Sequence, residues 1–325
     1  MAVPGNVELT YLALQSAKGT PAAAPTMVLR HSGGGLRPQR EQIPLPESDS
    51  STQEPDDNVV GIAPQGTIEG WVRLSEIDLL LQGVLGAVAN SGSNPNYVHT
   101  LTPAVALPYL TAWSVIPGVS CWRFDDVRIG SLGLQGQAGG GISYRATLNP
   151  LSYTFDTEPV VPAAFASDAK LTYPQVAVTI GGSHPGTVDQ WELLIQRNIG
   201  RLRGDSGLAD FDSSVALMQI SGSMQKVYTD DDDERAQFTG TTGGSTPTVT
   251  IFEETLNIAI TENANRLVDF DSNAIQYREY TRPINTDGTP LLVTRTFRTK
   301  RQTAVADNLT STVKNGKATP AAVPA

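Results

Sequence analysis

The chain has 325 residues and a formal net charge of −10, from 33 acidic and 23 basic side chains. A chain with this acidic excess gains little from counterion release on nucleic acid, which argues against a protein that grips DNA. Aromatic residues make up only 6% of the chain, whereas Gly (30) and Pro (22) are plentiful. This composition favours many short strands joined by turns over a helical bundle.

The single cysteine, Cys121, permits neither an internal disulfide nor a thiolate metal cluster, and we interpret it as a small buried side chain. The first residues show no basic start followed by an apolar run, so we expect no signal peptide. The longest apolar stretch is too short to span a bilayer. We therefore expect a protein that is made in a cytoplasm and acts without a membrane anchor.

Alternating apolar residues predict a first strand over residues 7–14. A long connection follows at about residues 20–58, rich in Pro, Gly, Ser and acid, with only residues 27–30 as a possible short strand. Structureless loops of this length are unusual inside compact domains, and they are usually disordered or reach a partner. We interpret this one as an arm that reaches a neighbouring molecule, with disorder as the alternative.

The chain is organised around a strand and a helix that follow each other directly. Apolar residues alternate over residues 67–74, as in a half-buried strand, and then recur with helical spacing over residues 75–88. Ser75 is expected to cap this helix, and Glu76 and Asp78 place negative charge at the positive end of its dipole. Gly86 can supply the left-handed conformation that ends it.

Nearly all of the remaining sequence predicts strands separated by turns. The alternation slips near Gly130, which indicates a β-bulge. The acidic run at residues 230–234 lacks the alternating ligands of a Ca²⁺ loop, and we expect a solvated loop that starts a short helix through Phe238. We expect one domain over residues 1–312, with possible surface insertions, and a flexible tail over 313–325. The expected strands cover residues 97–101, 110–116, 120–135, 142–148, 151–155, 176–180, 191–195, 218–224, 248–261 and 291–298.

No known catalytic pattern occurs in the sequence. His31, His99 and His184 lie far apart and form no HxH or HExxH motif. There is no GxSxG, no Walker A sequence, and no glycine-rich loop that opens a helix. Because no acid–base pair or nucleophile can be assembled, we expect no enzyme, no cofactor and no metal site.

Charge is segregated along the chain. The arm is acidic, whereas the stretch 278–301 is basic, and opposite patches on one chain favour head-to-tail association into rings or filaments. Ordinary scattered surface charge is the alternative. The residues expected to contact a neighbouring subunit or ring are Glu41, Glu47, Asp49, Glu54, Asp56 and Asp57 in the arm and Arg295, Arg298, Lys300 and Arg301 in the basic stretch.

The order of these elements resembles the tail tube proteins of long-tailed, siphovirus-like bacteriophages. A strand, a Pro/Gly-rich arm and a strand punctuated by Gly61, Gly66 and Gly70 run directly into an amphipathic helix that ends at Leu85-Gly86. The second half carries LTYPQVAVTIGG, then VDQWELLIQRN, then TVTIFEETLNIAI, which are also similar to that family. The chain is longer than simple tube subunits.

This resemblance, which extends to the tube proteins of type VI secretion, implies a mainly β subunit: an antiparallel β-sandwich or barrel with one flanking helix. Each subunit is expected to give four strands to the inner barrel of a hexameric ring, and rings are expected to stack into a tube through which double-stranded DNA is ejected. A barrel of about 24 strands, about 4.8 Å apart and tilted about 40°, has a radius of roughly 25 Å and a bore of about 40 Å. That bore admits a DNA duplex, and an acidic lining would let it slide.

The resemblance also implies a place in the virion tail after synthesis in the bacterial host cytoplasm, with a tape measure protein, a tail terminator and distal tail proteins as partners. Besides a β-rich hydrolase, which is the least favoured alternative, two other functions stay open on the residues alone. One is another virion β-protein, such as a capsid decoration or baseplate subunit. The other is a carbohydrate-binding β-sandwich in which Trp71, Trp113, Trp122 or Trp191 stacks on sugars, although core packing is the simpler role for each.

Overall fold

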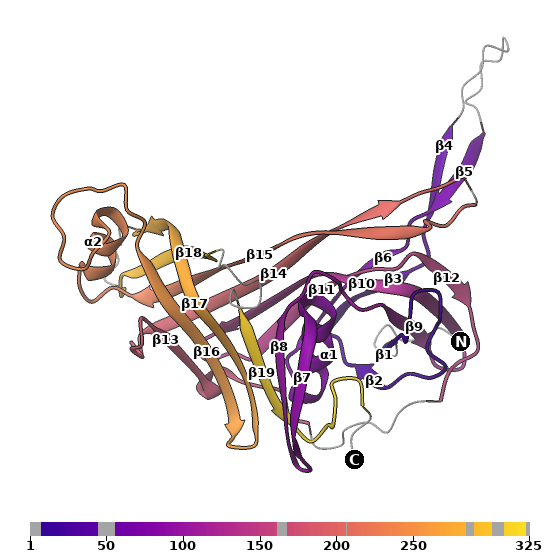
Figure 1. The fold of residues 1–325 in the computed structure, drawn as a ribbon, viewed down its shortest axis with the longest axis horizontal. Helices are drawn as coiled ribbons and strands as arrows, with labels where there is room; N and C mark the ends of the chain where they lie inside the picture. Colours follow the sequence, from indigo (N-terminus) through magenta and orange to yellow (C-terminus); the bar gives the residue numbers. More distant parts are fainter. Residues whose placement is uncertain are drawn as a thin grey trace, which may run out of the picture.

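The computed structural model describes residues 8–44, 56–160, 168–205, 207–283, 289–300 and 309–322. This part of the chain is mainly β, with antiparallel sheets and two α-helices, which confirms the predicted fold class (Figure 1). Its elements are β1 (Leu9–Leu14), β2 (Met27–Leu29), β3 (Gly33–Arg37), β4 (Arg40–Pro44), β5 (Asp57–Ile62), β6 (Gln65–Trp71), α1 (Leu74–Leu85), β7 (Gly86–Ser93), β8 (Asn96–Pro103), β9 (Leu110–Ile116), β10 (Ser120–Gln137), β11 (Ile142–Asn149), β12 (Ser152–Phe155), the 3₁₀ turn η1 (Tyr173–Gln175), β13 (Val176–Ile180), β14 (Val188–Leu202), β15 (Asp212–Val227), α2 (Asp232–Thr239), β16 (Glu253–Asn263), β17 (Arg266–Thr281), β18 (Leu292–Thr299) and β19 (Thr310–Asn315).

One large sheet, here called the main sheet, dominates the molecule. Its strand order is β3–β6–β11–β10–β14–β15–β18–β17–β16–β13, and every neighbouring pair is antiparallel. Figure 1 shows two of its long strands, β14 and β15, crossing most of the length of the molecule. Chain order and sheet order differ, so the sheet is built from segments that lie far apart in the sequence.

A smaller sheet, β2–β1–β9–β10–β12, shares strand β10 with the main sheet. The first half of β10 pairs with β9 and β12, and its second half pairs with β11 and β14. The pairing with β11 shifts between Ile129 and Ser131, which confirms the bulge predicted at Gly130. A second irregularity lies where β10 leaves β9, next to Asp126 with a φ of 53°. These two irregularities bend β10 so that it can pair with strands of both sheets.

Helix α1 lies inside the fold. It contacts β10 and β14 of the main sheet, and β7, β8 and β19 pack against it as well. Strand β19 joins β17 to the β7–β8 hairpin, so this group covers the side of the helix that the main sheet leaves open. All twelve residues of α1 are therefore buried, including its polar ones, and not only the predicted apolar stripe.

Both ends of α1 differ from the sequence prediction. The helix ends at Leu85 and not at residue 88, because Gly86 takes a φ of 103° and starts the β7 strand. At the other end the cap position is Arg73, two residues before the expected Ser75. The carboxylate of Asp168, which lies 93 residues later, accepts the Ser75 backbone N–H at 3.1 Å and also its hydroxyl. The carboxylate of Asp168, and not the hydroxyl of Ser75, therefore accepts a backbone N–H at the start of the helix.

The arm is not structureless, so that part of the prediction is wrong. The possible strand at 27–30 is confirmed as β2, and β3 joins the edge of the main sheet with Leu36 fully buried. Strands β4 and β5 pair with each other in a separate two-stranded hairpin. Figure 1 shows this hairpin projecting away from the body of the molecule. Among the described residues of the arm, the hairpin alone has the reaching geometry that we expected of the whole arm.

The expected flexible tail over 313–325 is wrong for residues 313–322. Strand β19 begins at Thr310 and pairs with both β8 and β17, and the side chain of Lys317 is only 1% exposed. Residues 323–325 lie outside the described part. The acidic run does start the predicted short helix, α2, which ends at Thr239. The extent of a single domain over residues 1–312 stays a prediction.

Candidate assembly surfaces

One face of the main sheet is covered with polar side chains. Strand register places residues opposite one another in rows that cross the sheet, and residues in one row share a face. The first row is Glu69, Arg145, Gly133, Leu194, Ser221, Arg298, Gln276 and Glu253. The second is Trp71, Ser143, Gln135, Glu192, Ser223, Thr296 and Glu279. The third is Thr67, Thr147, Ser131, Gln196 and Gln219, and the fourth is Gln137, Gln190, Gln225, Thr294 and Thr281.

These four rows define what we call the polar face, and hydroxyl and amide groups dominate it. Its charged members are Glu69, Arg145, Glu192, Arg298, Glu279 and Glu253, a small negative excess. The rows between them point to the other side and are mainly apolar. One of these core rows is Ile68, Ala146, Leu132, Ile195 and Ile220, all buried. The main sheet thus separates a dry core from a wet face along its full width.

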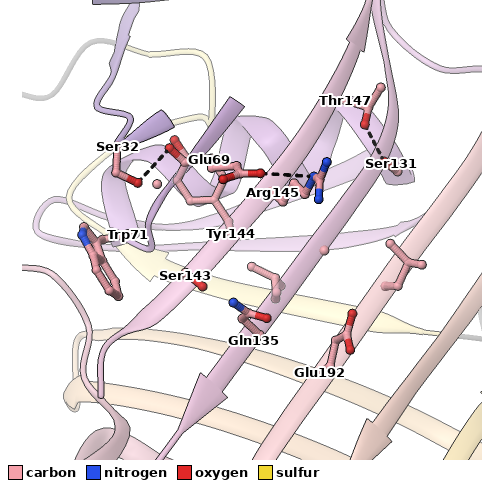
Figure 2. Close-up of a pocket in the computed structure, with 14 residues that line it drawn as sticks. Ser32, Glu69, Trp71, Ser131, Gln135, Ser143, Tyr144, Arg145, Thr147 and Glu192 are labelled. Carbon is pink, nitrogen blue, oxygen red and sulfur yellow. Dashed lines mark hydrogen bonds and ion pairs between the residues drawn. The ribbon is translucent and has the colours of Figure 1, made fainter. Parts of the chain in front are cut away.

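A hollow of about 600 Å³ lies on the polar face over β6, β11, β10 and β14 (Figure 2). Two of the residues that line it, Arg145 and Glu69, form an ion pair with Nε and Oε1 3.4 Å apart. The Ser131 hydroxyl donates to Thr147 Oγ1 at 3.0 Å. None of the residues that line it is a histidine or a cysteine. The side chains that line the hollow can form hydrogen bonds with a bound molecule, but they include no nucleophile next to a base. The hollow therefore fits a contact surface better than a catalytic site.

The β4–β5 hairpin carries apolar side chains into solvent. Ile43, Val59 and Val60 are 43%, 39% and 36% exposed. The base of the hairpin is fixed to the β14–β15 turn, because Arg203 pairs with Glu41 and the Ile62 amide donates to the Leu208 carbonyl at 2.9 Å. The same end of the molecule exposes Leu202, Leu208, Phe211 and Leu217. Exposed apolar residues gathered at one end mark a contact surface.

A second group of exposed apolar residues lies beyond the opposite end of strand β15. Helix α2 follows the last residue of β15 and carries Phe238, 56% exposed, and the loop after it carries Val249 and Ile251. Strand β15 has 16 residues, which corresponds to about 50 Å. The two apolar groups therefore lie at the two ends of the same long strand (Figure 1).

The predicted basic contact residues differ in their burial and in the contacts that they make. Arg295 is only 3% exposed and lies on the core side, 3.4 Å above the Tyr277 ring and 2.8 Å from Asp233. Arg298 lies on the polar face and donates to Gln276 at 3.3 Å. Lys300 pairs with Glu253 at 2.7 Å while remaining partly exposed. Arg301 lies outside the described residues.

The predicted acidic contact residues lie in or next to the hairpin. Glu41 is in β4, where it pairs with Arg203 as described above, and Asp56 and Asp57 are exposed at the start of β5. Glu47, Asp49 and Glu54 lie outside the described residues. The members of the two groups that lie in the described part of the chain form no ion pair with each other.

Buried charges that the sequence analysis did not anticipate fix helix α1 to the rest of the fold. Lys317 Nζ lies 3.0 Å from Asp78 Oδ1 and also donates to the Ser75 carbonyl, and Asn315 Nδ2 donates to the second Asp78 oxygen at 2.8 Å. Burial raises the pKa of Asp78, while Lys317 and Asn315 lower it. The expected dipole role of Asp78 is replaced by this network, which ties the end of the chain to the helix.

Glu76 occupies a second buried position in the first turn of the helix. Burial raises the pKa of Glu76 to about 8, because the effect of burial outweighs the opposite effect of the nearby charges of Arg73 and Arg30. Arg73 Nη1 and Arg30 Nε lie 3.9 and 3.8 Å from Glu76 Oε1, which is long for a charge-assisted hydrogen bond. This carboxyl is therefore a structural acid that holds its proton near neutral pH.

The tryptophans and the cysteine are mainly structural. Trp191 and Trp113 are buried, and Trp122 packs edge-on against Tyr153 and Phe155. Trp71 is 38% exposed at the rim of the hollow, with the Lys170 ammonium 5.9 Å from its ring. Cys121 is buried as expected, and burial raises the pKa of its thiol to about 11.

Two further findings concern the described residues as a group. Their histidines, cysteine and carboxylates form no cluster of three that could hold a metal ion. No helix among them is long and apolar enough to cross a membrane.

The comparisons with known proteins agree with the architecture. A search among curated proteins finds no match. A family model described as phage tail tube protein matches residues 5–304, nearly the whole chain. The polar sheet face, the projecting hairpin and the helix enclosed by sheets are therefore features of a chain that belongs to the phage tail tube protein family.

Proposed function

We propose that copies of this chain form rings, that the rings stack into the hollow tube of a phage tail, and that the tube conducts double-stranded DNA into the host. The polar face of the main sheet is the observation that carries this proposal. In a single copy this wide polar face is exposed to solvent, as one face of many antiparallel sheets is. In a ring, that surface becomes the wall of the bore and the core supports it from outside.

The chemistry of the polar face suits a conduit. Hydroxyl and amide groups hold a layer of water and exchange hydrogen bonds with it. The face carries both Arg145 and Arg298 and a small excess of glutamates, so it offers phosphate no continuous basic track. This balance is milder than the acidic lining expected from the sequence. DNA would meet a wet, weakly negative wall along which it slides without specific binding.

The two exposed apolar groups support axial stacking. The hairpin end of one ring would meet the α2 end of the next, because these groups lie at opposite ends of β15. Burial of side chains such as Phe211 and Phe238 at that junction would supply the favourable free energy of stacking. The hairpin then fulfils the role predicted for the arm, which is contact with a neighbouring ring.

Three of the four predicted basic residues remain candidates for the contact between rings. Arg298, Lys300 and Arg301 are the residues to test by substitution with Glu, and intact tubes after that change would count against the contact. Arg295 must be left out of this test, because its side chain is buried and paired within its own chain. A change there reports on folding.

The family also suggests partners and location. Before ejection, the bore would hold a tape measure protein, and a tail terminator and distal tail proteins would close the two ends of the tube. The subunit would be synthesised in the bacterial cytoplasm and act in the virion as a structural protein without catalytic activity.

Electron microscopy of the concentrated, purified protein tests the proposal directly, because only a tube subunit forms hollow rods. The same preparation tests the face. Gln219 is an exposed residue of the polar face, and a Gln219→Cys variant should react with both small and polymer-linked maleimides when unassembled. In tubes it should react only with the small reagent. Solid particles, or equal reaction with the polymer reagent in tubes, would refute the assignment.

A hairpin deletion tests the contact between rings. The Ala63 amide donates to the Gln39 carbonyl at 3.1 Å, so the ends of segment 40–62 are adjacent and a short Gly-Ser turn can join them. This design spares Leu36, which is buried in the core. We expect a folded subunit that no longer forms long tubes. Tubes of normal length would reject the proposed role of the hairpin.

A further inference from the structure

The main sheet contains the same arrangement of strands twice. In the first half, β6 leads into α1, and the later hairpin β10–β11 returns so that β11 lies between β6 and β10. In the second half, β15 leads into α2, and β17–β18 returns so that β18 lies between β15 and β17. One further strand completes each set: β3 precedes β6 in the chain and pairs with it in the first set, and β14 precedes β15 and pairs with it in the second.

The two sets of four strands are continuous with each other. Strand β10 pairs with β14 over residues 131–137, and this is the junction between the sets. Because every pair is antiparallel, corresponding strands of the two sets run in the same direction: β3 with β14, β6 with β15, β11 with β18 and β10 with β17. The register of the first polar row crosses all eight strands without a break, from Gly33 opposite Glu69 to Gln276.

The number of strands limits how many copies can surround a DNA-sized bore. With strands about 4.8 Å apart and tilted about 40°, three copies of eight strands give a barrel radius of about 24 Å and a bore of about 40 Å. Six copies of the same sheet give a radius of about 48 Å and a bore of about 90 Å. A duplex about 20 Å wide fits the first closely and leaves the second mostly empty. Counting β16 and β13 as well, which lie beyond β17, gives ten strands and increases each radius by about a quarter, and three copies still fit the duplex more closely than six.

We propose that three copies of this chain close one ring, each copy supplying the stretch of wall that two simple subunits supply in a hexamer. This inference rests on the proposed function. Neighbouring copies would meet through opposite edges of the main sheet, where β3 and β13, among the described strands, each pair on one side only. Different edges meet in such a contact, so it is heterologous, and a rotation of 120° closes it. The edges left open in a single copy are covered in the ring.

The direction of the strands agrees with closure. Strand β13, at one edge of the main sheet, runs opposite to β3, at the other edge, so the antiparallel alternation of the sheet continues from one copy to the next. The ring would then have true threefold symmetry with an approximate sixfold pattern in its inner wall. The difference between α1, enclosed by sheets, and α2, which has only Ala236 buried, would show the lower symmetry outside the wall.

Cryo-electron microscopy of tubes assembled from the full chain tests the inference. We expect each ring to contain three chains, and rotational averaging to give sharp density with threefold symmetry and blurred α2 positions with imposed sixfold symmetry. Mass per unit length should equal three chains of 34.6 kDa for each axial repeat. Six chains for each repeat would overturn the three-copy ring while leaving the conduit intact. A protein that forms no tube would refute the proposed function itself, and the inference with it.

A second readout uses the bore. Tubes of the Gln219→Cys variant can be treated with maleimides linked to polymers of increasing size, with the unassembled variant as the control. A three-copy ring predicts a cut-off near a bore of about 40 Å. Free reaction with polymers that require about twice that width would overturn the strand count as the determinant of ring size.

Discussion

The buried pair of Lys317 and Asp78 gives the sharpest prediction about how the fold is held together. Their side chains are 1% and 0% exposed, and their charged atoms lie 3.0 Å apart. Removal of one partner from a buried pair leaves an uncompensated charge, which costs about 3–5 kcal/mol. Lys317→Met should therefore lower the free energy of unfolding by about that amount, a large part of the 5–15 kcal/mol typical of a domain.

Two further variants isolate the charge effect. Lys314→Met, on the alternate face of β19 where the side chain is only partly buried, should change stability by less than about 1 kcal/mol. The double variant Lys317→Met/Asp78→Leu removes both charges and should recover most of the loss, since apolar replacement of a buried pair is often neutral. The assay is urea unfolding of the unassembled subunit, followed by circular dichroism. If the single variant unfolds at the wild-type midpoint, or the double variant is weaker than the single one, the reasoning fails.

Three other predictions each concern a single residue. Because native Glu76 holds a proton, with a pKa of about 8 against 4.5 for the free group, the free energy of unfolding should fall as pH rises from about 4.5 to about 8 and then level off; Glu76→Gln should flatten this profile, and an unchanged slope would contradict the assignment. Cys121 should resist thiol reagents at pH 8 in the native protein and react fully in denaturant, so rapid native labelling would show that it is accessible. Gly222→Ala should destabilise the subunit by about 1–3 kcal/mol in urea unfolding, because a Cβ there would lie 2.2 Å from the Glu192 carbonyl oxygen; an unchanged midpoint would show that the sheet yields.

Local patterns in the sequence predicted much of the fold. Strands such as β11, with alternate residues buried along its length, and the apolar stripe of α1 follow from side-chain periodicity alone. The bulge at Gly130 was detectable because a bulge shifts the alternation of side chains by one. Composition pointed to a mainly β protein, and the order of elements pointed to the tail tube family, which the match over residues 5–304 supports.

The prediction failed where the neighbours of a segment, and not its own pattern, set its structure. Strand β17 was missed because irregular pairing at residues 277–279 and several charged residues hide its alternation. Strand β7 is largely exposed and is held by its hairpin partner β8. Strand β19 looked like the start of a loose tail, yet its backbone pairs on both sides and Lys317 just beyond it is buried.

The sequence by itself determined the class of the protein, because periodicity, glycine and proline content and the absence of catalytic motifs are properties of short segments. Only the tertiary structure decided which residues lie on one surface. Glu69 and Glu253 are 184 positions apart along the chain, and they share a row only because seven antiparallel pairings place their strands in one sheet. Long-range register of this kind leaves no mark in any local pattern, so the polar face, the burial of Arg295 and the order of strands in the main sheet became visible only in the folded chain.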